Sequence, residues 1–324
     1  MSRIQEWSLP ESLQPDAAEL RFDLARALDA VVLVHAVIPE DAFTAGVLGT
    51  ERGGYGVVIN ADGLILTIGY LLTEATSIWI TTNRGDVVNG WPLTYDQVTG
   101  FGLIQPLGKV GTPWIERGSA ADVAIGDQVT VIGHGGRTHS LKTRVIDKRE
   151  FAGYWEYVLD EALFTAPAHP HWSGAALLGA DGKLIGIGSL LVQQEVNGEQ
   201  AHTNMFVPID LIEPLLDDLA AARASARAPR PWLGMYTQEA AGNLVVAGLA
   251  PGGPAEHAGV HPGDLVLGVG SMRTHGLAEF YRLVWRQGGA GVAVPLSLAR
   301  AGDVLRVSVK SANRNDFLRK PDLH

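Results

Sequence analysis

The amino-acid sequence predicts a soluble, mainly β protein of two domains. Its 324 residues exceed what one ordinary hydrophobic core takes up. Glycine accounts for 39 of them, about 12%, where an average protein has roughly 7%, and only 19% of the residues are charged. Short runs rich in Val, Ile and Leu recur between turn residues at a spacing of roughly 8–12 residues, which favours a sandwich or a barrel.

The N-terminal half reads as a surface segment followed by strands. Within the N-terminal helical segment, residues 1–29, the stretch over residues 16–29 is amphipathic and charged and predicts a surface helix. The apolar runs that follow predict a succession of short strands. Glycine accepts a positive φ at no steric cost, so three Gly-containing connections predict tight hairpins. These connections are residues 60–63, 83–85 and 179–182.

The C-terminal part changes character. Asp210 is placed to cap a helix, and residues 221–230, rich in Ala, Arg and Ser, predict a linker. Residues 231–312 then form a second module of short strands with one helix over residues 277–287, whose apolar side chains recur at helical spacing. The tail over residues 313–324 is polar, and we expect it to be frayed.

Composition excludes several functional classes. Lys and Arg number 25 and Asp and Glu 35, a formal net charge of −10, which repels phosphate and argues against nucleic-acid or anionic-membrane partners. The absence of Cys excludes disulfides, thiol nucleophiles and Cys-based metal sites. The most apolar stretch, residues 30–39, is half as long as a membrane span. We expect no cofactor, and a cytoplasmic location if Met1 is the native start, or a periplasmic one if leading residues were removed.

Several stretches of the chain match the motifs of one known family. Residues 54–67 read GYGVVINADGLILT. Residues 232–235 read WLGM, residues 251–260 read PGGPAEHAGV and residues 262–269 read PGDLVLGV. Together they resemble the HtrA family (DegP- and DegS-like) of trypsin-like serine proteases with a C-terminal PDZ domain.

The resemblance covers residues 30–312. It implies a chymotrypsin/trypsin-like double six-stranded β-barrel over residues 30–220, followed by one α+β PDZ domain over residues 231–312. It also implies that the protein forms a homo-oligomer, a trimer in many HtrA proteins, through N-terminal segments. Peptide binding and protein quality control are the functions that it suggests.

The catalytic positions implied by the resemblance are degenerate. Tyr70 stands in place of the His base, Gly100 in place of the orienting Asp, and His171 in place of the glycine that supplies an oxyanion-hole N–H, whereas Ser173 keeps the nucleophile position. A Tyr hydroxyl has a pKa near 10 and stays protonated at neutral pH, and glycine has no charge to orient a base. We therefore predict a pseudoprotease.

Two alternatives remain for the histidines near Ser173. Ser173 could act as the nucleophile of an active endopeptidase with a displaced His as base; the candidates are His134, His139, His169 and His171. His169 and His171 also resemble a metal-binding pair, but no third ligand is evident, so we expect a solvent-facing loop pair and no metal. Tyr70 and Trp172 could fill the former catalytic cleft with aromatic bulk.

The PDZ-like module keeps its binding loop. PDZ domains add a peptide C-terminus as a strand, while backbone N–H groups of a Gly-containing loop hold the carboxylate. The matching loop is Trp232, Leu233, Gly234 and Met235, and the helix over residues 277–287 forms the other wall of the groove. We predict binding of peptide or protein C-termini, or of misfolded protein, in a regulatory or chaperone-like role. The alternative is a purely structural subunit whose groove is closed.

Overall fold

The structure is a computed structural model that describes residues 7–196, 198–221 and 228–320. Most of the predicted linker, residues 222–227, lies outside this part of the chain. Spatial contacts divide the chain into two units. The first comprises Met1–Arg149, Glu161–Leu216 and Arg319–His324, and the second Glu150–Asp160 and Asp217–Leu318. A short internal segment, Glu150–Asp160, therefore groups with the C-terminal unit.

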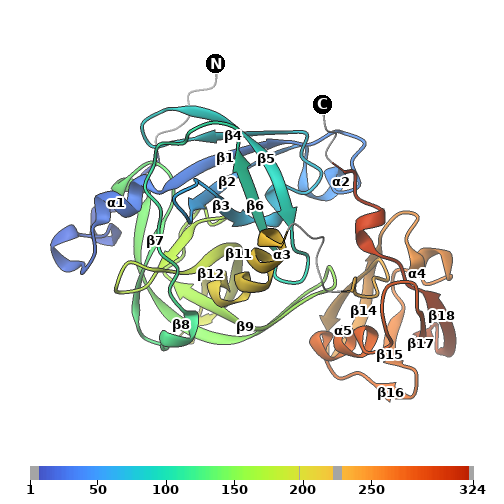
Figure 1. The fold of residues 1–324 in the computed structure, drawn as a ribbon. Coiled ribbons are helices and arrows are strands. Elements are labelled where there is room, and N and C mark those ends of the chain that lie inside the picture. Colours follow the sequence, from blue (N-terminus) through green and yellow to red (C-terminus); the bar gives the residue numbers. More distant parts are fainter. Residues whose placement is uncertain (1–6, 197, 222–227, 321–324) are drawn as a thin grey trace. The chain divides into compact units, whose positions relative to one another are not determined.

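The first unit contains two closed six-stranded barrels, as the sequence predicted (Figure 1). The first barrel has the order β1-β2-β3-β6-β5-β4. Its strands are β1 (Val31–Val37), β2 (Glu51–Val58), β3 (Ile65–Ile68), β4 (Ser77–Thr81), β5 (Val87–Tyr95) and β6 (Phe101–Pro106). Every side chain of β3 is buried, because one face of the strand points into the first barrel and the strand also packs against β11 of the second barrel. A short helix, α2 (Ala45–Leu48), lies between β1 and β2.

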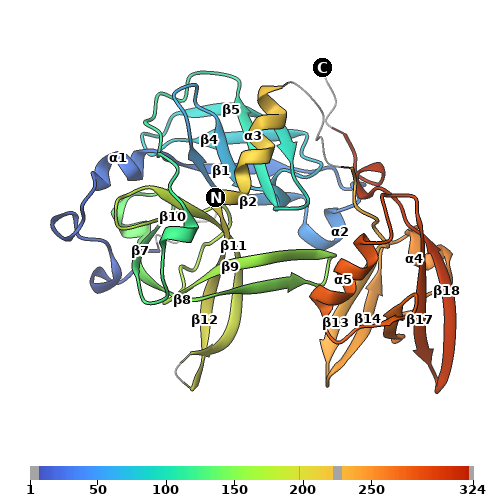
Figure 2. The same ribbon diagram turned by 60° about the horizontal axis from the view of Figure 1, so that its bottom comes forward.

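The second barrel has the order β10-β11-β12-β9-β8-β7. Its strands are β7 (Gln128–Ile132), β8 (Ser140–Gly153), β9 (Tyr157–Ala166), β10 (Ala176–Leu178), β11 (Leu184–Val196) and β12 (Glu199–Pro208), followed by α3 (Glu213–Ala220). Strands β8 and β9 form a long hairpin (Figure 2). A bulge in β11 shifts its register against β12 between Gly188 and Leu190. The bulge lets the intervening residue, Ser189, direct its carbonyl away from the ladder.

The predicted continuous helix over residues 16–29 is wrong. The chain forms a 3-10 turn at Ala17–Glu19 and a separate six-residue helix, α1 (Leu24–Asp29). The side chain of Asp16 accepts a hydrogen bond from the Ala18 N–H, and that of Asp23 from the Arg26 N–H. Each aspartate caps a new start, and an N-cap residue has non-helical backbone angles, so the second cap interrupts the periodic stretch.

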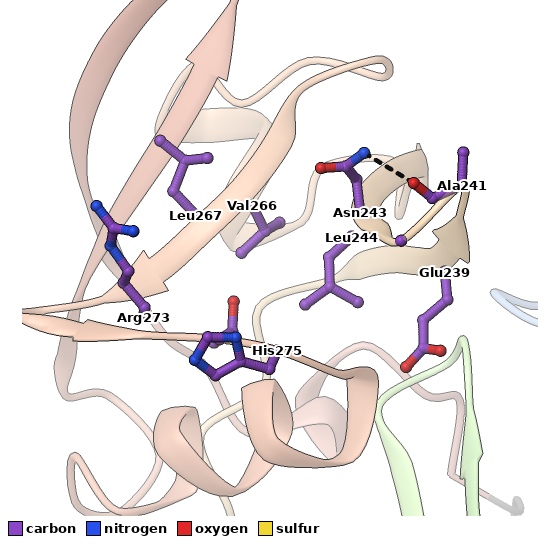
Figure 3. Close-up of a pocket in the computed structure, with 10 residues that line it drawn as sticks. Glu239, Ala241, Asn243, Leu244, Val266, Leu267, Arg273 and His275 are labelled. Atoms are coloured by element: carbon purple, nitrogen blue, oxygen red, sulfur yellow. Dashed lines mark hydrogen bonds between the residues drawn. The ribbon is translucent and has the colours of Figure 1, made fainter.

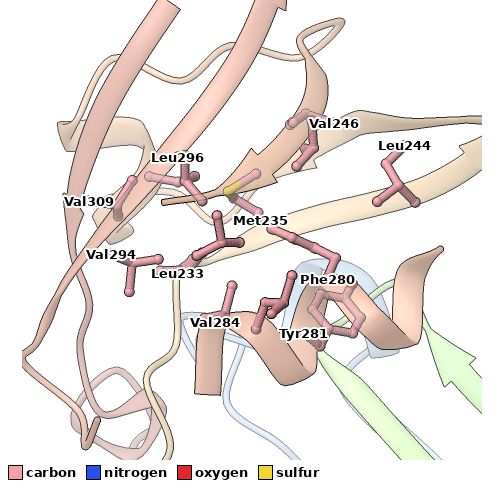
Figure 4. Close-up of a cluster of buried hydrophobic side chains, with 14 of the residues drawn as sticks. Leu233, Met235, Leu244, Val246, Phe280, Tyr281, Val284, Val294, Leu296 and Val309 are labelled. Atoms are coloured by element: carbon pink, nitrogen blue, oxygen red, sulfur yellow. The ribbon is translucent and has the colours of Figure 1, made fainter. Parts of the chain in front are cut away.

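The second unit is built on a six-stranded sheet. Its strands are β13 (Met235–Ala240), β14 (Asn243–Leu249), β15 (Leu265–Val269), β16 (Met272–Arg273), β17 (Ala293–Arg300) and β18 (Asp303–Lys310), with helices α4 (Pro254–His257) and α5 (Leu277–Trp285). The apolar face of α5 packs against the sheet, where Phe280 and Val284 meet Met235 and Leu296 (Figure 4). This core also includes Val158 from the internal segment.

The predicted frayed tail is wrong for its described part. Asn313 caps a 3-10 turn over Arg314–Asp316 by accepting from the Asn315 N–H. The ring of Phe317 then lies 4.8 Å from that of Trp232, so an aromatic contact as well as a cap orders the chain here. Across the described residues, the helices are all too short or too polar to cross a membrane.

Candidate functional site

Two side chains that the sequence assigned to catalytic positions meet in the first unit. Tyr70 lies on a 3-10 turn, Gly69–Leu71, that directly follows β3. Its Oη lies 2.7 Å from Ser173 Oγ and donates to the carbonyl oxygen of Ser189 at 2.8 Å. The register shift in β11 makes this carbonyl available. The phenol therefore bridges the serine and the bulge.

The protons in this contact can be placed. Tyr70 has one hydroxyl proton, which goes to the Ser189 carbonyl because a carbonyl only accepts. The Ser173 hydroxyl must then donate to the phenol oxygen. Burial raises the pKa of Tyr70 to about 12, although hydrogen bonds from Ser173 and Trp172 oppose the shift. A neutral phenol that keeps its own proton cannot remove a second one from serine.

Gly100 supplies backbone geometry to the same region. It has a φ of 84°, in the left-handed region that favours glycine. Its N–H donates to the Asp96 carbonyl at 2.7 Å, and its carbonyl accepts from the Gly69 N–H at 2.7 Å. The Asp96 side chain accepts from the N–H groups of Val98 and Thr99 and so caps the turn. This position anchors the turn that carries Tyr70 and offers no carboxylate.

The N–H of His171 is held by its neighbour. It donates to Nδ1 of His169 at 3.1 Å, while Nε2 of His169 lies 2.9 Å from the carbonyl oxygen of His139. Since a carbonyl only accepts, the proton of His169 is on Nε2 and its only lone pair is on Nδ1. Burial lowers the pKa of His169 to about 4, with backbone hydrogen bonds opposing. The imidazole is therefore neutral and both of its nitrogens are used.

The predicted solvent-facing histidine pair is wrong for His169, which is fully buried, whereas His171 is exposed. Asn204 holds the backbone of His169 from both sides. Its Oδ1 accepts from the His169 N–H at 2.6 Å, and its Nδ2 donates to the His169 carbonyl at 3.1 Å. This pairing draws residue 169 into the barrel, because a buried backbone needs such partners.

The other candidate bases have different partners. Nδ1 of His139 lies 2.8 Å from the Gly135 carbonyl, and Nε2 of His134 lies 3.1 Å from that of Thr82. The ring of His171 lies 4.5 Å from that of Trp7. In the described part of the chain, no group of three or more His, Asp or Glu side chains could hold a metal ion.

The predicted peptide-binding loop forms a complete set of donors in the second unit. The N–H groups of Leu233, Gly234 and Met235 point to one carboxylate, that of Glu156. The distances to its Oε1 are 3.1, 2.7 and 3.1 Å, and Leu233 N is also 3.0 Å from Oε2. Gly234 has a φ of 71°, which turns successive N–H groups to one side. Trp232 adds a ring contact and pairs its backbone with Ala312.

Glu156 is the functional residue that sequence reasoning missed. It belongs to the internal segment Glu150–Asp160 of the second unit and is 7% exposed. Burial raises the pKa of its carboxyl group to about 7, although the loop N–H groups and Arg314 oppose the shift. Its φ of 64° is unusual for a residue with a side chain. The only local signal is the aromatic turn Gly153-Tyr154-Trp155-Glu156-Tyr157.

A separate hollow of about 430 Å³ lies at the other end of β13, and Arg273 and His275 contribute to its lining (Figure 3). Glu239 also lines it, but the carboxylate of Glu239 accepts from the Leu277 N–H at 2.7 Å. The hollow does not include any residue of the Leu233–Met235 loop.

Known proteins share this architecture. The trypsin-like peptidase domain family matches residues 54–187, and the PDZ domain family matches residues 245–300. A protein of Synechocystis named HhoA is 25% identical over 286 residues, which cover 80% of this chain and 70% of HhoA. The serine endoprotease DegS of Haemophilus influenzae is 22% identical over a stretch that covers 79% of this chain and 76% of DegS. The chain has the two domains of the HtrA proteases, which are its homologues.

Solved HtrA-type structures have the same fold. A serine endoprotease from Yersinia pestis aligns with a TM-score of 0.51 at 23% identity, covering 89% of this chain and 96% of that one. The HtrA-type protease AlgW with a tripeptide aligns at 0.53 and 20% identity, covering 95% and 99%. The chain spans 55% of the length of a DegP-like relative from Halomonas elongata. Ser173 and Glu156 both lie in the stretch that matches the trypsin-like peptidase family, whereas the Leu233–Met235 loop precedes the stretch that matches the PDZ family.

Proposed function

We propose that this HtrA-family chain is a pseudoprotease that recognises peptide or protein C-termini through its PDZ loop, in a regulatory or chaperone-like role. The contact between Ser173 and Tyr70 carries the first half of the proposal. A serine hydroxyl is a weak nucleophile until a base takes its proton. Here the hydroxyl donates to a phenol whose own proton is bound to the Ser189 carbonyl and whose pKa is about 12.

The other positions of the catalytic site also support an inactive protease. Gly100 offers no charge to orient or stabilise an imidazolium. The His171 N–H, which would serve the oxyanion in an HtrA protease, is bound to His169. Disabling a serine-protease triad lowers turnover by about 10⁶-fold, and loss of one oxyanion donor lowers it by about 10²–10³-fold. His169 cannot act as the displaced base, because its single lone pair accepts from the His171 N–H.

A fluorophosphonate probe tests this half. We expect no labelling of Ser173 and no casein cleavage, with the wild type equal to Ser173→Ala under conditions in which trypsin reacts fully. Labelling or cleavage that disappears in Ser173→Ala would establish the active endopeptidase instead.

The loop supports the second half. Three N–H groups converge on one carboxylate with hydrogen-bond geometry, which is the chemistry that PDZ domains use for a peptide terminus. AlgW, a protein of the same fold, was solved with a tripeptide and with a decapeptide. A library of peptides with free C-termini tests the proposal, and the same peptides with C-terminal amides are the control. If no peptide of the library binds, even when the loop has been freed of Glu156, the purely structural subunit is favoured.

A further inference from the structure

The loop that would hold a peptide carboxylate already holds one from the same chain. Glu156 gives its carboxylate to three loop N–H groups and is almost completely buried. A second carboxylate cannot bind at the same time, because the three N–H donors of the loop already donate to Glu156. Glu156 and a peptide terminus are therefore mutually exclusive occupants.

The backbone of the internal segment extends the likeness to a bound peptide. Two residues before Glu156, the Tyr154 carbonyl accepts from the Thr237 N–H of β13 at 3.2 Å and from Oη of Tyr281 on α5 at 3.0 Å. The segment thus contacts both the β13 edge and the α5 wall, which are the two sides that a strand added to the groove would touch. The ring of Tyr154 also lies edge-on to that of Tyr236, 6.0 Å away.

Apolar and charged contacts complete the binding. Val158 is 7% exposed and belongs to the core cluster that contains Met235 and Phe280. Arg282 on α5 makes ion pairs with Glu150 and Asp160, at the two ends of the segment. One carboxylate, one strand-like backbone contact, one apolar side chain and two ion pairs are the contacts expected of a ligand.

The conformation of Glu156 indicates that these contacts hold it in place. Its φ of 64° disfavours a residue with a side chain by about 1–2 kcal/mol. Such backbone strain persists where several surrounding contacts hold the residue in the strained conformation. The loop N–H groups are the contacts that offset it here.

We propose that Glu150–Asp160 is an internal ligand of the PDZ loop, and that a peptide C-terminus binds only by displacing Glu156. The inference rests on the proposed peptide-binding function and adds its regulation. A tethered ligand competes at an effective concentration in the millimolar range, so the apparent affinity for a free peptide is the intrinsic affinity multiplied by the fraction of loops that are open.

Two variants of the full chain test the competition. Glu156→Gln keeps the shape but places an NH2 donor in a side chain whose two oxygens both accept from the loop N–H groups, and Glu156→Gly removes the side chain and suits the positive φ. Glu161→Gln is the matched control, since it removes an exposed carboxylate from β9, the strand that directly follows Glu156. Circular dichroism establishes that each variant is folded.

The first measurement needs no peptide. Amide hydrogen exchange at Leu233, Gly234 and Met235 is expected to be slow in the wild type and in Glu161→Gln, and at least about tenfold faster in both Glu156 variants. Equal exchange in the wild type and the Glu156 variants would overturn the proposal, because Glu156 would then not occupy the loop.

The second measurement uses fluorescein-labelled peptides with free, apolar C-termini. We expect these peptides to bind the Glu156 variants about tenfold more tightly than the wild type, or more. The same peptides with C-terminal amides are expected to bind neither the variants nor the wild type. Equal affinity for the wild type and the variants would overturn the internal ligand and leave peptide recognition intact. If the loop N–H groups exchange faster in the Glu156 variants but no peptide binds to any of the proteins, peptide recognition itself fails, and the inference fails with it.

Discussion

The Ser173 site and the PDZ loop share one feature and differ in its consequence. In both, a backbone N–H that could grip an anion is bound by a side chain of the same chain. At Ser173 the acceptor for the His171 N–H is a neutral imidazole inside the barrel. In the loop the acceptor is the carboxylate of Glu156, which has the charge and shape of the natural ligand of such loops.

On the functions that we propose, this difference separates a lost catalytic activity from a covered binding site. At Ser173 the positions that the family resemblance assigns to the base, the orienting acid and the oxyanion donor hold Tyr70, Gly100 and His171, so we expect no single substitution to restore the chemistry. In the loop every donor is present and correctly aimed, so one substitution exposes it. Both sites are filled, but only the second stays complementary to a ligand.

The largest contrast is expected from two glycines, one in each site. Gly174 has a φ of 74°, and a Cβ there would lie 2.0 Å from the Tyr55 carbonyl oxygen. Gly234 has a φ of 71°, but its Cβ would come no closer than 3.2 Å to Ala250 and Trp232. We expect Gly174→Ala to destabilise the first unit by about 4 kcal/mol and Gly234→Ala to destabilise the second by about 1–2 kcal/mol.

Urea unfolding, monitored by hydrogen exchange of the backbone amides in β10 and β13, measures the loss of stability in each unit. Gly198→Ala is the control for a positive φ with open space, since no atom lies within 4 Å of its Cβ. Equal destabilisation at positions 174 and 234 would contradict the tighter backbone packing that we assign to the Ser173 turn.

The two sites are also expected to respond oppositely to pH. The pKa of His169 is lowered to about 4, with His139 and His171 facing it, so the unfolded chain binds the additional proton and stability falls as pH drops from about 6.5 to 4. The pKa of Glu156 is raised to about 7, with Arg314, Tyr236 and Tyr281 around it. Its docked form therefore binds the proton, and docking weakens as pH rises through about 7.

Each effect is on the order of 3 kcal/mol over its range. Protection of β10 against exchange measures the first and protection of the loop amides the second, at pH values between 4 and 8. His169→Gln is expected to flatten the first profile alone and Glu156→Gln the second alone. If either substitution flattened both pH profiles, the titrating group would be one shared by the two sites and not His169 or Glu156.

How much of this could be foreseen differs between the fold and the sites. The strands and hairpins follow from apolar runs and turn glycines, and Tyr70 and Gly100 are local substitutions that a motif exposes. The broken N-terminal helix was also within reach, because Asp16 and Asp23 are both N-cap residues. The burial of His169 could not be predicted from the sequence, because it depends on Asn204, 35 positions further along the chain.

Glu156 is the clearest limit of sequence reasoning. Its partners in the loop are 77 to 79 positions away, and an acidic residue in a turn ordinarily faces water. Only the fold brings the internal segment Glu150–Asp160 to this loop within the second unit. Function that arises from occupation of a site, and not from its residues, leaves no motif to find.

The smallest expected effects come from deleting one phenol oxygen at each site, and they sharpen the contrast between lost and covered function. Tyr70→Phe removes the phenol oxygen that accepts from the Ser173 hydroxyl and leaves the Ser189 carbonyl without its donor from Tyr70. We expect a loss of about 1–3 kcal/mol in the first unit and still no fluorophosphonate labelling. The probe separates this outcome from an active serine that Tyr70 merely blocks, for which labelling would appear.

Tyr281→Phe is milder, because the Tyr154 carbonyl keeps its bond from the Thr237 N–H. The segment should lose about 1 kcal/mol of docking free energy, which raises the open fraction and tightens peptide binding by about fivefold. Tyr95→Phe provides a control for loss of a phenol elsewhere, in β5 of the first barrel. Unchanged loop exchange in Tyr281→Phe would mean that the Tyr281 hydroxyl does not help to hold the segment, and that its other contacts determine whether the loop is open.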